Sequence, residues 1–370
     1  MAISKIRLNG VTKMDVTNTT ATVSDVASGK VFTQVDGTTG TGTGTSAASG
    51  SDWTRKDGKT HLHINVYNDV FLTVYLRFEQ NTNNGNTIDW GDGSAVELIV
   101  GTSSQLLPHT YADKGEYIIT ITNTNGTFTF GQTSTIAGYI FQQAGGNGSN
   151  TKFIHFASIL EKIELGQGWN ISYGRQFKAC QNLTDVYINN KPLQTDIGSA
   201  LFQNCKSLRS VSGAEGWDEN IISSSSYAFS NTNLESTYIP PNLIVIPADY
   251  MNQYGVDVTA LREINLHEGI TAIGNNAFKF CANVPEITIP STVTSIGQSA
   301  FEQSYGCHAV HMKPASPPTL GNTAAFPTNN GQTYTQVMYV PYSADHSILE
   351  AYKTATNWST YASYMQEEPQ

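Results

Sequence analysis

Apolar residues recur with a fixed spacing through the second half of the chain, most regularly between Leu261 and Phe301. Shifting this stretch by 23 residues superposes eight of its positions, beginning with Leu261 on Val284. A period of about 20–50 residues is typical of a solenoid, whose stacked units share one core. Within one unit, Leu261, Ile264 and Leu266 alternate as the inward side chains of a short strand do. The pattern predicts a repeat solenoid built from short strands.

The rest of each unit is explained by its small and large residues. Ala277 and Phe278 supply a small and a large side chain to the interior, and Gly269 and Gly274 are expected to let the chain turn. The strands of the solenoid, which we place at residues 153–342, begin at Leu160, Leu183, Leu208, Leu234, Leu261, Val284 and Cys307. Apolar residues at helical spacing after Ser343 predict a helical cap over residues 343–370.

The phrase ITIPSTVTSIGQSAFEQS, which runs from Ile287 to Ser304, resembles the BspA-type leucine-rich repeat. This resemblance implies a leucine-rich-repeat solenoid and a place among bacterial surface proteins. It does not imply one particular ligand, because that family is associated with many binding roles.

Residues 51–132 alternate with a strand period and are broken by turn residues, which predicts an antiparallel β-sandwich. The expected strands are 60–67, 70–79, 87–90, 96–100, 117–123 and 127–131. The phrase from Ile88 to Gly93, followed by His109–Tyr111, resembles the PKD-type immunoglobulin-like fold. That resemblance implies a spacer or a carbohydrate-contact module. The whole chain is therefore predicted to be mainly β, with an immunoglobulin-like sandwich followed by the solenoid.

The N-terminal 36 residues alternate weakly and are rich in Thr and Val, which favours strands over helices. Gly, Thr and Ser dominate residues 37–50 and predict a linker, and residues 133–152 predict a second one. Residues 1–36 with the following Gly-Thr run resemble the leader of phage tail and fibre proteins. This resemblance implies an anchoring segment that docks on other structural proteins of a virion.

Charged residues make up 14% of the chain, the formal net charge is −10 and the pI is about 5.2. The acidic balance argues against nucleic acid or an anionic membrane surface as a partner. No apolar run is long enough to insert in a membrane, and the N-terminus lacks the apolar segment of a secretory signal. We therefore expect a virion protein made in the host cytoplasm, and keep as the alternative a bacterial surface or secreted adhesin whose signal peptide was removed.

Chemical motifs are scarce in this sequence. The phosphate-loop, zinc-protease, serine-hydrolase and C-x-x-C patterns are missing, so we predict no enzyme, no cofactor and no metal site. The nearest approaches to a site, Asp89, Asp92 and His109 and the pair His61 and His63, are interpreted as structural. The four cysteines are expected to be buried thiols, with a disulfide between Cys180 and Cys205 as an open alternative.

One outward residue separates the last two inward residues of each predicted strand. Stacked strands lie about 4.8 Å apart, so these residues should form a ladder face along the solenoid. Its members are Glu164, Tyr187, Ser212, Tyr238, Asn265, Thr288, His311 and Tyr339. Tyr side chains offer contact area and a hydroxyl at low entropic cost. Tyr187, Tyr238, His311 and Tyr339 are therefore our candidates for contact with a host surface protein or glycan, and a homo-oligomer remains an open alternative.

Overall fold

The computed structural model describes residues 53–83, 85–130, 140, 158–170, 175–189, 200–213, 226–241, 243–254, 260–327 and 337–370, and the backbone of five further strands. The chain divides into two compact units, Met1–Arg55 and Lys56–Gln370. The boundary lies a few residues after the predicted linker at 37–50, and the sandwich and the solenoid fall in the same unit.

The N-terminal unit contains two antiparallel strand pairs. Strand β1 (Lys5–Leu8) pairs with β2 (Val11–Asp15), and β3 (Val31–Thr33) pairs with β4 (Thr39–Thr41). The strand content expected for residues 1–36 is confirmed. The Gly-Thr run predicted as a linker contributes β4, so part of it is ordered by pairing with β3.

Residues 56–130 form two antiparallel sheet layers around an apolar interior. One layer contains β5 (Thr60–Val66), β10 (Gly115–Asn123), β7 (Asn86–Asp89) and β8 (Glu97–Ile99). The other contains β11 (Phe128–Phe130), β6 (Thr73–Gln80) and β9 (Gln105–Thr110), and a short 3-10 helix spans Asp69–Phe71. Strand β9 was not predicted, because Pro108 interrupts its sequence and proline is disfavoured inside sheets.

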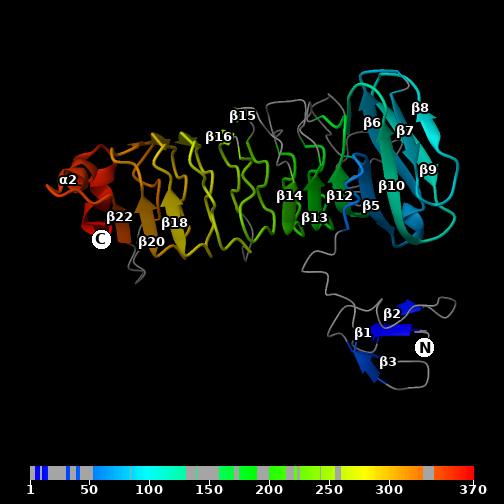
Figure 1. The fold of residues 1–370 in the computed structure, drawn as a ribbon, viewed down its shortest axis with the longest axis horizontal. Helices are drawn as coiled ribbons and strands as arrows, with labels where there is room; N and C mark the ends of the chain where they lie inside the picture. Colours follow the sequence, from blue (N-terminus) through cyan, green and yellow to red (C-terminus); the bar gives the residue numbers. More distant parts are fainter. Residues whose placement is uncertain are drawn as a thin grey trace. The chain divides into compact units, whose positions relative to one another are not determined.

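The solenoid carries short parallel strands on two sides (Figure 1). On the ladder side lie β12 (Leu160–Leu165), β13 (Asp185–Ile188), β14 (Ser210–Gly213), β18 (Glu286–Ile289), β20 (Ala309–Met312) and β22 (Val337–Val340). On the other side lie β15 (Ile221–Ile222), β16 (Leu243–Ile246), β17 (Ala272–Ile273), β19 (Ser295–Ile296) and β21 (Thr319–Leu320). The predicted repeat architecture is confirmed by this arrangement.

The first solenoid strand continues the sheet of the N-terminal layers, and Figure 1 shows β5 beside β12. Strand β5 pairs antiparallel with β12, so one seven-stranded sheet runs through both parts. Ile140, the one described residue of the predicted linker at 133–152, is buried and bonds through its backbone to Arg77 and Gln176. The two-layer unit is therefore joined to the first coil through one continuous sheet. It also covers the edge of that coil, which would otherwise be open to solvent.

Aromatic side chains stack along the interior of the solenoid, one from each coil. Ring centroids of Phe177 and Phe202 lie 5.4 Å apart, and those of Phe278 and Phe301 also 5.4 Å apart. In the coil that lacks a phenylalanine, Tyr250 and Met251 are both buried. The expected role of Gly274 is wrong: its φ is not positive, and a Cβ there would lie 2.5 Å from the Ala248 nitrogen. Glycine is required at this position because the backbones of adjacent coils approach so closely.

The C-terminal segment closes the array, as predicted. Helix α2 (Ser347–Thr354) and a 3-10 helix at Trp358–Tyr364 precede a final strand, β23 (Met365–Glu367). The Trp358 and Tyr361 rings pack on Phe326, the last ring of the interior column. Strand β23 pairs with β22, so the cap also extends the ladder by one strand, which the helical pattern did not predict.

Candidate functional site: the ladder face of the solenoid

The strand registers place most of the predicted ladder residues in line, but in two separate groups. Glu164, Tyr187 and Ser212 are paired across β12, β13 and β14. Thr288, His311 and Tyr339 are paired across β18, β20 and β22, and Gln366 of β23 adds a fourth member. The four candidates do not therefore form one continuous site.

In the first group, Glu164 and Tyr187 are contacted by the chain that precedes β5, whereas Ser212 is exposed. Glu164 is fully buried, and its Oε1 accepts hydrogen bonds from the Lys56 backbone nitrogen at 2.7 Å and from Asn189 Nδ2 at 3.2 Å. The Lys56 ammonium lies 5.4 Å from the centre of the Tyr187 ring, close enough for a cation–π contact. Tyr187 faces outward as predicted, but Lys56 already lies over its ring.

Tyr238 is a correction to the predicted face, because its ring turns into the solenoid. It packs edge-on against the buried Phe229 with centroids 5.8 Å apart. The hydroxyl is buried, and no hydrogen-bond partner for it lies among the residues that the structure describes. Burial also raises the pKa of Tyr238 above its usual value. Thr237 and Pro240 are also buried. The sequence alternation therefore predicted Tyr238 as an outward residue next to Thr237 and did not reveal that its ring turns inward.

Two substitutions distinguish the inward orientation of Tyr238 from an outward one. Tyr238→Phe removes the unpaired hydroxyl, so the free energy of unfolding should stay unchanged or rise by about 1 kcal/mol. Tyr238→Ala removes a half-buried ring and should lower the free energy of unfolding by about 2 kcal/mol. Chemical denaturation of both variants provides the measurement. An unchanged stability of the alanine variant would contradict the inward orientation.

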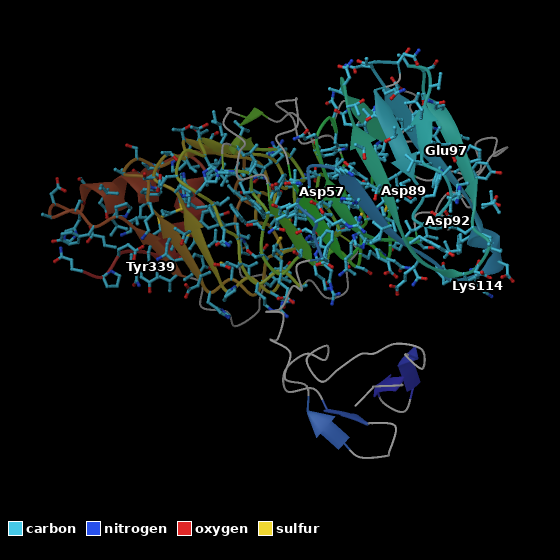
Figure 2. All side chains as sticks on the ribbon, turned by 45° about the vertical axis from the view of Figure 1, so that its right-hand side comes forward. Asp57, Asp89, Asp92, Glu97, Lys114 and Tyr339 are labelled. Carbon is cyan, nitrogen blue, oxygen red and sulfur yellow. The ribbon has the colours of Figure 1, made fainter. Side chains whose placement is uncertain are left out.

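The second group contains a fixed aromatic pair. The rings of His311 and Tyr339 stack with centroids 4.8 Å apart and planes 14° apart. Glu368 Oε1 lies 2.8 Å from His311 Nδ1 and 2.8 Å from the Lys313 ammonium. Burial alone would raise the pKa of Glu368, but the hydrogen bonds from Lys313 and His311 outweigh it and lower the pKa. The ionised carboxylate therefore holds the imidazole ring in place. Figure 2 labels Tyr339 near the C-terminal end of the solenoid.

A shallow depression of about 500 Å³ lies next to this pair, on the side of Thr288. We call it the β18 groove and define it by Arg262, Glu263, Asn265, Pro285, Glu286 and Thr288. All six residues are exposed. Of these, only Asn265 and Thr288 were in the predicted ladder. Glu263 and Glu286 were missed because they lie two positions before Asn265 and Thr288, and the prediction took only one outward residue from each strand.

Four of the histidines that the structure describes lie within hydrogen-bond distance of a carboxylate. His61 is buried, with Nε2 2.9 Å from Asp57 and Nδ1 3.1 Å from the Thr120 hydroxyl. His109 Nε2 lies 2.8 Å from Asp92, and similar pairs join His311 to Glu368 and His346 to Glu367. Within the described ranges, no cluster of three or more His, Cys, Asp or Glu side chains could hold a metal ion.

The four cysteines are free and buried, which agrees with the thiol interpretation. The Cys205 thiol donates a hydrogen bond to the Phe177 carbonyl at 3.0 Å. A hydrogen bond with Cys205 and burial both raise the pKa of Cys180.

In the part of the chain that the structure describes, no helix is both long and apolar enough to span a bilayer.

The parallel ladders and the interior column of rings define a leucine-rich-repeat solenoid. Residues 149–257, 173–308 and 254–325 match the family described as BspA type leucine rich repeat region. This part of the chain is therefore a BspA-type leucine-rich repeat region, as the phrase at Ile287–Ser304 predicted.

Two of the solved structures to which the chain is similar are leucine-rich proteins. One is a leucine rich cell surface protein from Faecalibacterium prausnitzii A2-165, with 19% identity, a TM-score of 0.35, and 53% of each chain covered. The other is a leucine-rich repeat protein from Bacteroides ovatus ATCC 8483, with 16% identity and a TM-score of 0.27. That alignment covers 56% of this chain and 66% of the other. No curated protein matches the chain.

Proposed function

We propose that this chain is a non-enzymatic recognition protein of the adhesin type, acting at a bacterial surface or after secretion. The contact surface is the C-terminal part of the ladder face, formed by Thr288, His311, Tyr339 and Gln366 together with the β18 groove. The observation that carries the proposal is the half-buried His311–Tyr339 stack on the outer face of the sheet, where Glu368 contacts the imidazole at 2.8 Å.

A fixed aromatic platform suits non-covalent recognition because little side-chain entropy is lost when a ligand binds. Polar neighbours on both sides, Thr288 and Gln366, add hydrogen-bonding groups in register with the rings. The low charge content favours hydrogen bonding and stacking over long-range electrostatic attraction. The repeat solenoid supplies the rigid support for this surface.

Two finer interpretations belong to the same proposal. We propose that the two-layer unit at 56–130 is a PKD-type immunoglobulin-like spacer; the burial of Trp90 and Tyr111 between its layers supports this. The repeat family favours the surface adhesin over the virion protein that the N-terminal leader resembles. The anchoring role expected for residues 1–36 stays a prediction, and their side chains lie outside the described residues.

The test compares binding of the whole chain and its variants to bacterial and host cell surfaces and to an immobilised glycan array. Tyr339→Ala should weaken binding at least tenfold with little change in the melting temperature, because its ring is part of the platform and is only half-buried. Tyr187→Ala is the matched control, since Lys56 covers that ring, and it should bind like the unmodified chain. If Tyr339→Ala bound every target as tightly as the unmodified chain does, the proposed contact surface would be refuted.

A further inference from the structure

The ladder is interrupted before strand β18, and a proline stands at the start of the interruption. In four other places, the amide at the beginning of one strand segment donates to a carbonyl of the preceding coil. These bonds are Thr184 to Glu161, Arg209 to Thr184, Arg262 to Glu235 and His308 to Pro285, at 2.7–2.9 Å. Pro285 occupies the same position in β18 and has no N–H to donate to the coil of Arg262.

A second proline stands at the other end of the strand. At this position Asn189 donates its backbone N–H to Leu165 at 2.8 Å, and Lys313 donates to Ile289 at 3.0 Å. Pro290 takes the position in the β18 coil and again has no donor. Among the described strands, β18 pairs with β20 alone and is therefore an edge strand in the middle of the ladder face.

The free edge of β18 presents main-chain groups to the groove. The carbonyls of Pro285 and Ile289 accept bonds from the following coil, so these two main-chain groups point away from the groove. Residues of a strand direct their N–H and C=O groups to alternate sides. The N–H and C=O groups of Glu286 and Thr288 consequently point toward the preceding coil, and both residues line the groove.

We propose that the β18 groove binds an extended segment of a partner polypeptide with basic side chains, which adds a short strand to the edge of β18 between Pro285 and Pro290. A polypeptide is favoured because its main chain repeats donors and acceptors at the spacing of the strand edge. Basic residues are favoured because the exposed carboxylates of Glu263 and Glu286 flank that edge. This inference rests on the proposed function and names the ligand class of its surface.

The two prolines also limit what the edge can do. A long unprotected edge strand is an aggregation hazard, and proline at its ends is one of the ways in which proteins block sheet extension. The open edge between Pro285 and Pro290 is only four residues long, Glu286–Ile289. It therefore admits a short strand and prevents a continuous sheet from forming with a second copy.

In the experiment, peptides that bind the full chain are selected from a displayed library of random linear peptides. The affinity of the selected peptides is then measured for the unmodified chain and for three variants. Pro285→Thr introduces threonine, the residue type found at the equivalent position, Thr184, of an earlier coil. The N–H of the new residue can bond to the Arg262 carbonyl, and this bond would narrow the groove. Glu286→Gln removes one carboxylate and keeps the shape. Pro108→Thr, at an exposed position of β9, is the matched control for removing a proline.

Selected peptides should be basic and should bind Pro285→Thr and Glu286→Gln at least tenfold more weakly than the unmodified chain and Pro108→Thr. Methylating alternate amide nitrogens of the best peptide should abolish its binding, because strand pairing needs those donors. Peptides that bind all variants equally, or keep their affinity when methylated, would overturn the inference. The inference would also be overturned if the binding of a glycan depended on Pro285 while the binding of no peptide did. Loss of the Tyr339 effect on every ligand would count against the proposed function instead.

Discussion

Phe301→Ala lowers the free energy of unfolding by about 4 kcal/mol, the largest effect that we expect from a single substitution in this chain. Phe301 is fully buried and stacks on both neighbours in the interior column. Its ring centroid lies 5.4 Å from that of Phe278 and 5.3 Å from that of Phe326. Truncation loses the transfer energy of the ring and leaves a cavity between two coils whose spacing is fixed by backbone bonds.

Denaturant titration of the whole chain measures this loss. Phe301→Leu should cost less than half as much, because leucine refills most of the cavity. Tyr254→Ala serves as the control, since this aromatic side chain is 69% exposed and its removal should change stability by less than about 0.5 kcal/mol. A loss below about 2 kcal/mol for Phe301→Ala would show that the coils can close over the gap.

Gly166→Ala is expected to lower the free energy of unfolding by about 3 kcal/mol by pushing apart the two parts of the larger unit. Gly166 follows strand β12, and the segment from Gly58 to Thr60 lies against it. A Cβ would stand 2.2 Å from the Lys59 carbonyl carbon and 2.4 Å from the Gly58 oxygen. The Gly166 amide also donates to the Thr60 hydroxyl at 2.8 Å, and this bond would lengthen.

Gly115→Ala is the matched control for this substitution. The atoms nearest to its added Cβ would belong to the Tyr117 side chain, at 3.6 Å or more, so the stability should change little. Hydrogen exchange then locates the damage: amides of β5 and β12 should lose protection in the Gly166 variant before those of β20 and β22 do. Uniform loss across the chain, or no loss, would contradict the inferred junction.

The repeat and its interior could be predicted from the sequence because both depend on local spacing. An inward residue every second position and a phenylalanine once in each coil are visible without knowing what lies opposite them. The same reasoning found six strands of the two-layer unit and missed β9, where Pro108 breaks the local pattern. Gly274 was located correctly but explained wrongly, since the neighbouring coil rather than a turn requires it.

The candidate site was only partly predictable. His311 and Tyr339 are brought together as the ladder spacing implied, and their stack confirms the register. Tyr187 has the same local pattern, yet a backbone segment more than a hundred residues earlier covers its neighbour Glu164 and places Lys56 over its ring. Tyr238 also has that pattern, but space beside Phe229 admits its ring. Long-range contacts of this kind leave no signal in the spacing of one strand.

The sequence by itself determined the repeat, its apolar interior and the positions of Pro285 and Pro290, because each follows from residue type and period alone. Only the tertiary structure decided that β5 joins β12, which outward residues stay exposed, and that the prolines open a strand edge. The physical reason is that side-chain exposure and backbone pairing depend on which segments meet. Those meetings join residues far apart in the chain, and the local pattern constrains them only weakly.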